Sequence, residues 1–230
     1  MILNGHHDAK DTLGVTRSTG TLRRSGERRG MSSKPIDDAP DRPRHWIPDD
    51  LWRTIQRSIP IVCVDAVPVR LTTKPDGRQI VTSVGLIRRA VPDPFGEPDG
   101  SSLTGRSGWG IVGGRMRHGA TFAEELARQI RETLGPETVA TPIDATNPTC
   151  VAQYSPNGPD SRFDATDPRQ HAIGLTWIVT LVGTLSPQGE ATGFDWFPVD
   201  ALPPPHAFGF GQHNVVRACL ERHRTTGHAP

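Results

Sequence analysis

The sequence lacks both a strong excess of charge and any long apolar run. Its 230 residues include 26 basic and 25 acidic side chains, for a formal net charge of +1. A chain this close to neutral has no global field to draw it to nucleic acid or to a membrane surface. No apolar run approaches the roughly 20 residues of a membrane span, and the N-terminus has no apolar core of the signal-peptide type. These absences predict a cytoplasmic protein with no nucleic-acid or membrane partner.

Cysteine and lysine are also scarce. The three cysteines, Cys63, Cys150 and Cys219, are odd in number and have no C-x-x-C spacing. We therefore expect buried free thiols in a cytosolic protein rather than a disulfide framework. Only three of the 26 basic residues are lysine. This bias, with frequent Ala, Gly and Pro, is typical of a bacterial protein from a GC-rich genome.

The distribution of apolar residues divides the chain into one folded part and two tails. Residues 1–44 have low hydrophobicity, many charges and no periodicity, which predicts a disordered N-terminal tail. Residues 45–224 have the length and patterning of one ordinary domain. Residues 225–230 are expected to form a flexible C-terminal tail.

Strand patterns dominate the folded part. Short helices are expected after Pro48 and over 212–223, and a KPDG turn at 74–77 predicts a hairpin. The expected strands are 59–70, 79–90, 108–112, 148–155, 171–185 and 190–199. Two polar loops, 92–107 and 157–170, separate some of them. Because strands and helices do not alternate, a doubly wound fold is excluded, and an α/β domain with a mixed sheet is favoured.

The most informative stretch runs from Gly108 to Gly135 and has the pattern of a strand, a glycine turn and an amphipathic helix. Gly113-Gly114 can adopt backbone angles that other residues avoid and allows close approach of a ligand. Thr121 and Glu124 have the spacing of a capping box. Apolar residues then recur at helical spacing, which predicts one buried stripe. The stripe comprises Phe122, Leu126, Ile130 and Leu134.

This stretch resembles the Nudix box, a loop-helix-loop motif with the pattern G-x5-E-x7-R-E-U-x-E-E-x-G-U, where U is a bulky aliphatic residue. Counted from Gly114, its later positions hold Ala120, Arg128, Gln129, Ile130, Glu132, Thr133, Gly135 and Pro136. Three of the four acidic positions are therefore lost, at Ala120, Gln129 and Thr133. The resemblance implies a Nudix-like α/β/α sandwich with a mixed β-sheet.

The lost carboxylates bear on metal binding. Positions 129, 132 and 133 share one helix face, and carboxylates there hold divalent cations against a diphosphate in the Nudix family. Mg²⁺ prefers oxygen ligands, commonly one or two carboxylates plus substrate phosphate. The resemblance thus implies a weak single Mg²⁺ site formed by Glu132, the Gln129 side chain and the Gly113 carbonyl, and completed largely by substrate.

Beyond the box, the chain is similar to one Nudix branch, the GDP-mannose mannosyl hydrolases. The similarity lies in three segments, which are DLWRTIQRSIPIVCVDAV, the Trp109–Arg115 entry to the box and DWFPVDAL. It implies a nucleoside diphosphate linked to a sugar or other small group as substrate. By position, the substrate contacts would be Asp65, Arg88 or Arg89, Arg115 and Arg128. Arginine suits this task because its planar fork pairs bidentately with phosphate.

The general base of that branch has no equivalent here, since its Gln-His pair falls near Glu190-Ala191. Glu190 could replace the lost group as a base or ligand. His171 is the other candidate base, because histidine titrates near neutral pH. With Glu132, these residues form the expected catalytic set.

Each of these residues also has a structural interpretation. Asp65 could be a paired carboxylate at a strand end, and Arg128 could pair within its helix with Glu124, Glu125 or Glu132. His171 could bond locally, and Glu190 could be a solvated turn residue. Four tryptophans are expected in the core, with base stacking as the alternative for one of them. They are Trp52, Trp109, Trp177 and Trp196.

Three functions therefore stay open from sequence. The first is a Nudix-like hydrolase of a nucleotide or nucleotide sugar. The second is a catalytically degenerate Nudix-fold protein that binds such a molecule. The third is a metal-independent biosynthetic enzyme with altered chemistry. Members of this fold often dimerise, so the resemblance also admits a homodimer.

Overall fold

The computed structural model describes residues 47–89, 108–158, 160 and 162–226 of the chain. The predicted N-terminal tail and the polar loop 92–107 lie outside the described residues, as do residues 227–230 of the predicted C-terminal tail. Within the described part, no helix is long and apolar enough to cross a membrane.

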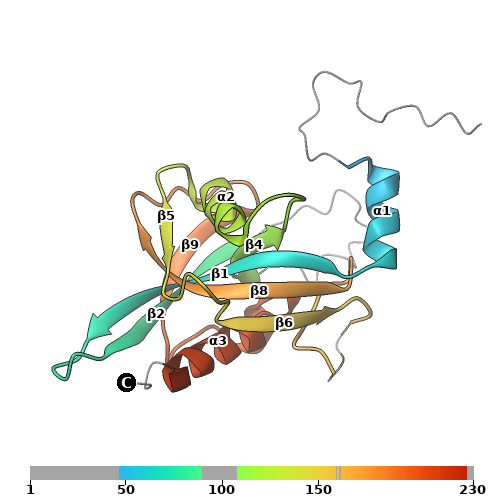
Figure 1. Cartoon of the computed structure of the whole chain (residues 1–230). Coiled ribbons are helices and arrows are strands. Elements are labelled where there is room, and N and C mark those ends of the chain that lie inside the picture. Colours follow the sequence, from blue (N-terminus) through green and yellow to red (C-terminus); the bar gives the residue numbers. More distant parts are fainter. Residues whose placement is uncertain (1–46, 90–107, 159, 161, 227–230) are drawn as a thin grey trace, which may run out of the picture. The chain divides into compact units, whose positions relative to one another are not determined.

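The described residues form one mixed β-sheet of nine strands, flanked by helices (Figure 1). The strands are β1 (Ile61–Thr73), β2 (Gln79–Arg89), β3 (Gly108–Gly110), β4 (Val112–Arg115), β5 (Val139–Pro142), β6 (Cys150–Ser155), β7 (Ala165–Thr166), β8 (Ala172–Val182) and β9 (Ala191–Pro198). The helices are α1 (Asp49–Ser58), α2 (Phe122–Leu134) and α3 (His213–Thr226), with short 3-10 turns at Pro205–Ala207 and Gly209–Gly211.

Strand β1 is the hub of the sheet because its two halves pair with different neighbours. Its first half runs parallel to β8 and antiparallel to the short β4. Its second half pairs antiparallel with β2 through the predicted KPDG hairpin. The strands β5 and β6 then add to β8, while β3 and β9 add to β2. The parallel pairs β1–β8 and β6–β7 lie among antiparallel neighbours, so the sheet is mixed, as predicted.

Two apolar clusters hold α2 and α3 on opposite faces of the sheet. Helix α2 places Leu126, Ile130 and Leu134 against one face. Helix α3 places Val215, Val216 and Cys219 against the other. Burial of each apolar side chain is worth about 1.5–3 kcal/mol. Packing against the sheet is therefore the main source of stability for both helices. The predicted α/β/α arrangement is confirmed.

The strand predicted over 108–112 is in fact two strands with different partners. Strand β3 pairs with β2, and β4 pairs with β1. The switch occurs at Ile111, whose backbone N–H donates to Oε1 of Gln212 at 3.1 Å rather than to a neighbouring strand. A sequence pattern shows that a segment is extended but not which neighbours it pairs with.

Three other expectations need correction. Phe122 lies at the first position of α2 and is 45% exposed, although its ring approaches Trp177 at 5.6 Å. Strand β5 falls within residues 136–147, a segment that begins with Pro136 and for which the sequence predicts a connecting loop. Of the four tryptophans expected in the core, Trp177 alone is buried, and the other three are half-buried.

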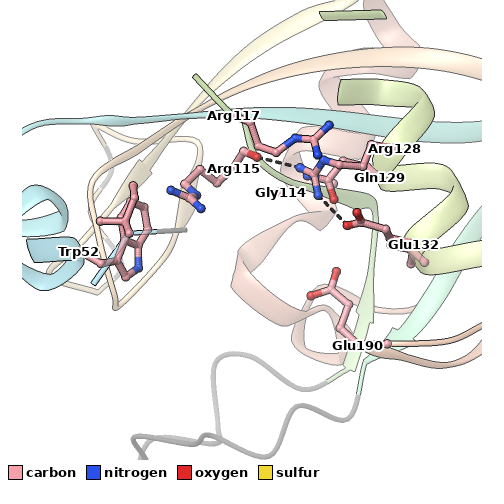
Figure 2. Close-up of a pocket in the computed structure, with 12 residues that line it drawn as sticks. Trp52, Gly114, Arg115, Arg117, Arg128, Gln129, Glu132 and Glu190 are labelled. Atoms are coloured by element: carbon pink, nitrogen blue, oxygen red, sulfur yellow. Dashed lines mark hydrogen bonds and ion pairs between the residues drawn. The ribbon is translucent and has the colours of Figure 1, made fainter. Parts of the chain in front are cut away.

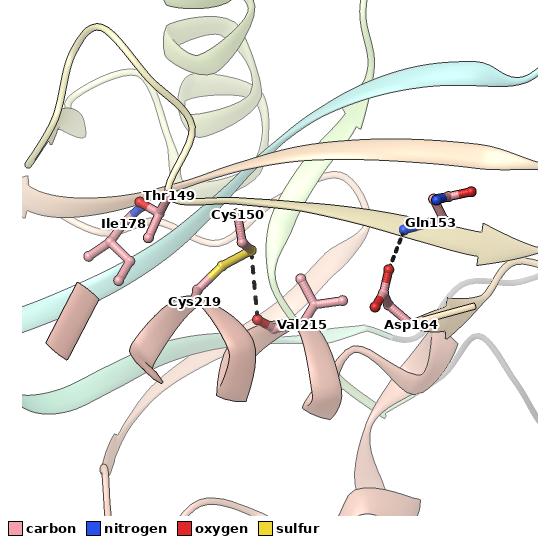
Figure 3. Close-up of a disulfide and its surroundings, with 7 residues drawn as sticks. All are labelled: Thr149, Cys150, Gln153, Asp164, Ile178, Val215 and Cys219. Carbon is pink, nitrogen blue, oxygen red and sulfur yellow. Dashed lines mark hydrogen bonds between the residues drawn. A yellow bond between two sulfur atoms is a disulfide. The ribbon is translucent and has the colours of Figure 1, made fainter. Parts of the chain in front are cut away.

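The expectation of free thiols is wrong for two of the three cysteines. Cys150 on β6 and Cys219 on α3 form a disulfide with a Cα–Cα distance of 5.4 Å (Figure 3). Both residues are buried in the cluster beneath α3. They are 69 residues apart in sequence, so only the packing of α3 on the sheet brings them together. Cys63 is the free cysteine.

The disulfide yields a stability prediction. Closing a loop of 69 residues restricts the unfolded chain, and this effect alone is worth about 4 kcal/mol. We expect the Cys150→Ser/Cys219→Ser double variant to lose about that much unfolding free energy in urea denaturation under non-reducing conditions. Cys63→Ser is the matched control and should unfold close to the wild type. Equal stability of the double variant and the wild type under oxidising conditions would contradict the pairing.

Candidate active site

A cavity of about 640 Å³ opens where α1, β4, α2 and the segment before β9 meet. Its lining residues are Ile47, Trp52, Gly113, Gly114, Arg115, Arg117, Arg128, Gln129, Glu132, Thr133, Gly189 and Glu190. Figure 2 shows Glu132 and Glu190 on one side of it, with Trp52 and Arg115 across from them. The volume lies within the range of small-molecule sites. The sequence predictions of Arg115, Arg128, Gln129, Glu132 and Glu190 thus converge on one place.

The glycine turn forms the floor of the cavity because other side chains pack tightly against it. A Cβ on Gly113 would lie 2.0 Å from Oδ1 of Asp65, and a Cβ on Gly114 would lie 2.8 Å from Nε2 of Gln129. Neither position could hold a larger residue without displacing these groups. The two glycines therefore allow β4 to approach both β1 and α2 closely.

A buried ion-pair network joins β4 to α2 beneath the arginines of the cavity. Glu125 is fully buried, and its two oxygens accept from Arg117 Nε at 2.6 Å and Arg128 Nε at 2.9 Å. Burial acts to raise the pKa of Glu125, but hydrogen bonds from Arg128 and Arg117 outweigh it and lower the pKa below its usual value. Glu125 is therefore ionised and fixes both guanidinium groups.

Arg128 is held by contacts through all three of its nitrogens. Besides Glu125, it donates to the Arg115 carbonyl at 3.0 Å and to Glu132 Oε2 at 2.6 Å. The intrahelical pairing proposed from sequence is thus present with Glu125 and Glu132. Glu124 instead completes the predicted capping box with Thr121. In this arrangement Arg128 shapes the cavity wall and holds β4 and Glu132 in place.

Arg115 extends to the opposite side of the cavity. Its guanidinium lies 4.4 Å from the ring centroid of Trp52 on α1, a cation–π contact (Figure 2). Burial lowers the pKa of Arg115, and the nearby charge of Arg128 adds to this effect, although an arginine stays protonated at any ordinary pH. Arg115 thus presents its guanidinium to the cavity, and Arg117, two positions later, lines the cavity while paired with Glu125.

Glu190 connects the cavity to a buried group of charges. Its Oε2 accepts from Nη2 of Arg89 at 2.5 Å, while its Oε1 is buried and has no hydrogen-bond partner among the described residues. The segment before it is anchored to α2, since Gln188 donates to the carbonyls of Thr133 and Arg131. Glu190 is therefore a positioned side chain rather than a solvated turn residue.

Four of the expected site residues do not line the cavity. Asp65 is buried directly behind Gly113, and Arg89 reaches the cavity only through Glu190. Arg88 is exposed, with its guanidinium 5.2 Å from the ring of Trp109. His171 lies at the start of β8, where its ring packs against Phe163 at 5.5 Å and its carbonyl accepts from Ile61. Of the two candidate bases, only Glu190 faces the cavity.

The cavity residues do not fit a resident divalent cation. Among the described residues, no group of three or more His, Cys, Asp or Glu side chains converges as metal ligands. Gln129 is buried and packs under Gly114, and Thr133 is buried as well. Glu132, which retains the remaining acidic position, is neutralised by Arg128. The helix face that would bind metal in the Nudix box has been replaced by packing and ion pairing.

Comparison with known proteins agrees with this architecture. Residues 42–222 match the family described as a domain of unknown function, DUF4916. The chain belongs to this family. Among curated proteins, no match was found.

Solved structures with a similar fold include nucleotide hydrolases. A possible asymmetric diadenosine tetraphosphate hydrolase from Jonesia denitrificans DSM 20603 is 29% identical, with a TM-score of 0.57 over 72% of this chain and 95% of that chain. A Nudix hydrolase from Nitrosomonas europaea is 19% identical, with a TM-score of 0.41 over 72% of this chain and 73% of that chain.

A third similar structure was solved with a metal. It is a bifunctional NMN adenylyltransferase/ADP-ribose pyrophosphatase from Francisella tularensis, in complex with AMP and a manganese ion. It is 16% identical, with a TM-score of 0.45 over 75% of this chain and 44% of that chain. The similarity to the Jonesia structure, with its TM-score of 0.57, agrees with the Nudix-like α/β fold that was predicted for this DUF4916 protein.

Sequence reasoning missed three residues that shape the site. Trp52 was expected in the core, yet it lines the cavity from a helix that buries none of its residues. Arg117 lies two positions after Arg115, at a position where the Nudix box specifies no residue type. Glu125 was considered only as a partner of Arg128. The capping box fixes where α2 starts. Counted from that start, Glu125 is next to Leu126 of the buried stripe, and this position could have indicated that Glu125 is buried.

The network around Glu125 can be tested by stability. Glu125→Gln leaves two arginines near a buried neutral amide, and loss of one partner of a buried ion pair costs about 3 kcal/mol. We expect a drop of that order in the free energy of unfolding, measured by urea denaturation. Glu137→Gln changes an exposed glutamate and should stay within about 0.5 kcal/mol of the wild type. Similar stabilities of both variants would refute the role assigned to Glu125.

The burial of Asp65 predicts that folding stability depends on pH. Burial raises its pKa to about 7, with Arg89 opposing the rise and Glu190 adding to it. Because the folded state holds this proton above pH 4 and the unfolded state does not, folding stability falls from pH 4 to pH 7 and then levels off. Relative to the wild type, Asp65→Asn should gain up to about 4 kcal/mol across this interval. Chemical denaturation at several pH values measures the gain. A difference in unfolding free energy between variant and wild type that does not change from pH 4 to pH 7 would refute the raised pKa of Asp65.

Proposed function

We propose that this protein hydrolyses a nucleoside diphosphate linked to a sugar or other small group, and that it does so without a resident metal. The observation that carries the proposal is the convergence of Arg115, Arg117 and Glu190 on one cavity of about 640 Å³. The arginines bind the diphosphate and stabilise negative charge as the bond to it breaks. Support for a small nucleotide substrate comes from the Jonesia relative.

Glu190 acts as the general base in this proposal. Arg89 holds one of its oxygens, and the other lacks a hydrogen-bond partner among the described residues. The Glu190 carboxylate lines the cavity, where it accepts a proton from water as the water attacks the substrate. Glu132 lies on the same side of the cavity and, through its pair with Arg128, keeps the helix face in place.

A binding protein without hydrolysis is the second candidate. It is favoured by the lost acidic positions at Ala120, Gln129 and Thr133 and by the absence of a metal-ligand cluster among the described residues. Such a protein would keep the arginines for phosphate binding but would release its ligand unchanged.

Turnover and binding together distinguish these candidates. Diadenosine tetraphosphate, ADP-ribose and GDP-mannose would each be incubated with the protein, with Mg²⁺ and with EDTA, and products separated by chromatography. We expect cleavage of at least one compound in both conditions. Glu190→Gln should lower kcat by about 10²–10⁴-fold while the Kd for the released nucleotide, measured by isothermal titration, changes little.

Glu137→Gln is the matched control and should keep wild-type turnover. Wild-type rates in Glu190→Gln would show that Glu190 is not the general base. Binding with no cleavage by the wild type would establish the second candidate. Cleavage that occurs only with Mg²⁺ and is lost in Glu132→Gln would instead assign Glu132 to a cation carried by the substrate.

A further inference from the structure

Trp52 differs from the other described tryptophans in what surrounds it. Each of the others packs against another aromatic ring, at centroid distances of 4.8, 5.6 and 5.2 Å. The three pairs are Trp109–Phe197, Trp177–Phe122 and Trp196–Phe194. Within the described part of the chain, the Trp52 ring has no such aromatic partner; the guanidinium of Arg115 lies over it, and both side chains line the cavity.

Core packing does not account for the position of Trp52. Helix α1 buries none of its residues, and Leu51 beside Trp52 is 43% exposed. The helix is nevertheless attached to the rest of the domain, since Gln56 Nε2 donates to Oε1 of Gln170 at 2.9 Å. Trp52 is therefore held at the cavity as a half-buried indole with little apolar structure behind it.

The cavity consequently has two chemically different ends. The end formed by α2 and the segment before β9 contains Arg128, Glu132 and Glu190. The end formed by α1 and the segment before it contains Ile47 and Trp52, with Arg115 between the two ends (Figure 2). An anionic part of a ligand can bind to the guanidinium of Arg115 between the ends, and a flat apolar part fits the end with Trp52.

We propose that Trp52, together with the guanidinium of Arg115, is the stacking site for the nucleobase of the ligand. The planar guanidinium lies over the indole, and both groups offer flat faces that stack on aromatic rings. Arg115 would then contact the base with its face and the phosphates with its N–H groups. This assignment rests on the proposed function only in taking a nucleotide as the ligand, and it requires no turnover.

Binding measurements with and without a base test the assignment. Isothermal titration would compare ADP, GDP and UDP with inorganic diphosphate, using the full-length wild type, Trp52→Ala and Trp52→Phe. Base–aromatic stacking is worth about 1–3 kcal/mol, so Trp52→Ala should weaken nucleoside diphosphate binding about 5–150-fold. Diphosphate binding should change less than about threefold, and Trp52→Phe should retain most of the nucleotide affinity.

Tryptophan fluorescence gives a second readout. Nucleoside diphosphate should quench the emission of the wild type, and this quenching should be lost in Trp52→Phe. The matched control is Trp196→Phe, which changes a tryptophan outside the cavity lining and should preserve the quenching. Because α1 buries no residue, both Trp52 variants should remain folded.

Three outcomes would overturn the assignment. Equal losses of nucleotide and diphosphate affinity in Trp52→Ala would show that Trp52 only positions Arg115. Unchanged nucleotide affinity in that variant would show that the base lies elsewhere. Failure of the wild type to bind any of the three nucleoside diphosphates would show that nucleotides of this class are not the ligand. A wild type that binds them with this dependence on Trp52 but cleaves no substrate would refute the hydrolase and leave the stacking site intact.

Discussion

The buried carboxylate of Glu125 is the interaction on which the cavity depends. It lies on α2, is fully buried, and holds Arg117 and Arg128 by charged hydrogen bonds. Arg128 in turn reaches the Arg115 carbonyl, so one acidic group fixes the helix to the strand that carries the glycine turn. A buried charge is stable only when it is paired and hydrogen-bonded. The same contacts that satisfy Glu125 therefore orient the cationic wall.

This network also explains how a Nudix-like fold persists without the acidic face of its motif. Where carboxylates would bind metal, the chain has the buried Gln129 and Thr133, and Glu132 is paired with Arg128. Those substitutions remove a cluster of like charges that would repel one another in the absence of cations. In the proposed function, Arg115 and Arg117 supply the attraction for phosphate that a metal would otherwise provide.

Much of the site was predictable from the sequence, because the motif positions lie within one continuous segment. The capping box, the buried stripe and the glycine turn are all local features, and local geometry brings Arg115, Arg128 and Glu132 to the same cavity. The other lining residues come from distant parts of the chain. Trp52 reaches the cavity on α1, where its ring meets the Arg115 side chain from the end of β4, and Glu190 reaches it because the segment before β9 is hydrogen-bonded to the end of α2.

The sequence alone determined the elements with local signals, including the hairpin turn at 74–77, the capped helix α2 and most strands of a mixed sheet. Tertiary structure decided the features that depend on contacts between distant segments. It split the predicted strand at Ile111 between two partners, paired Cys150 with Cys219 across 69 residues, and buried Asp65 behind Gly113. Periodicity and capping act over a few residues, whereas strand partners and buried charges are set by which distant surfaces pack together.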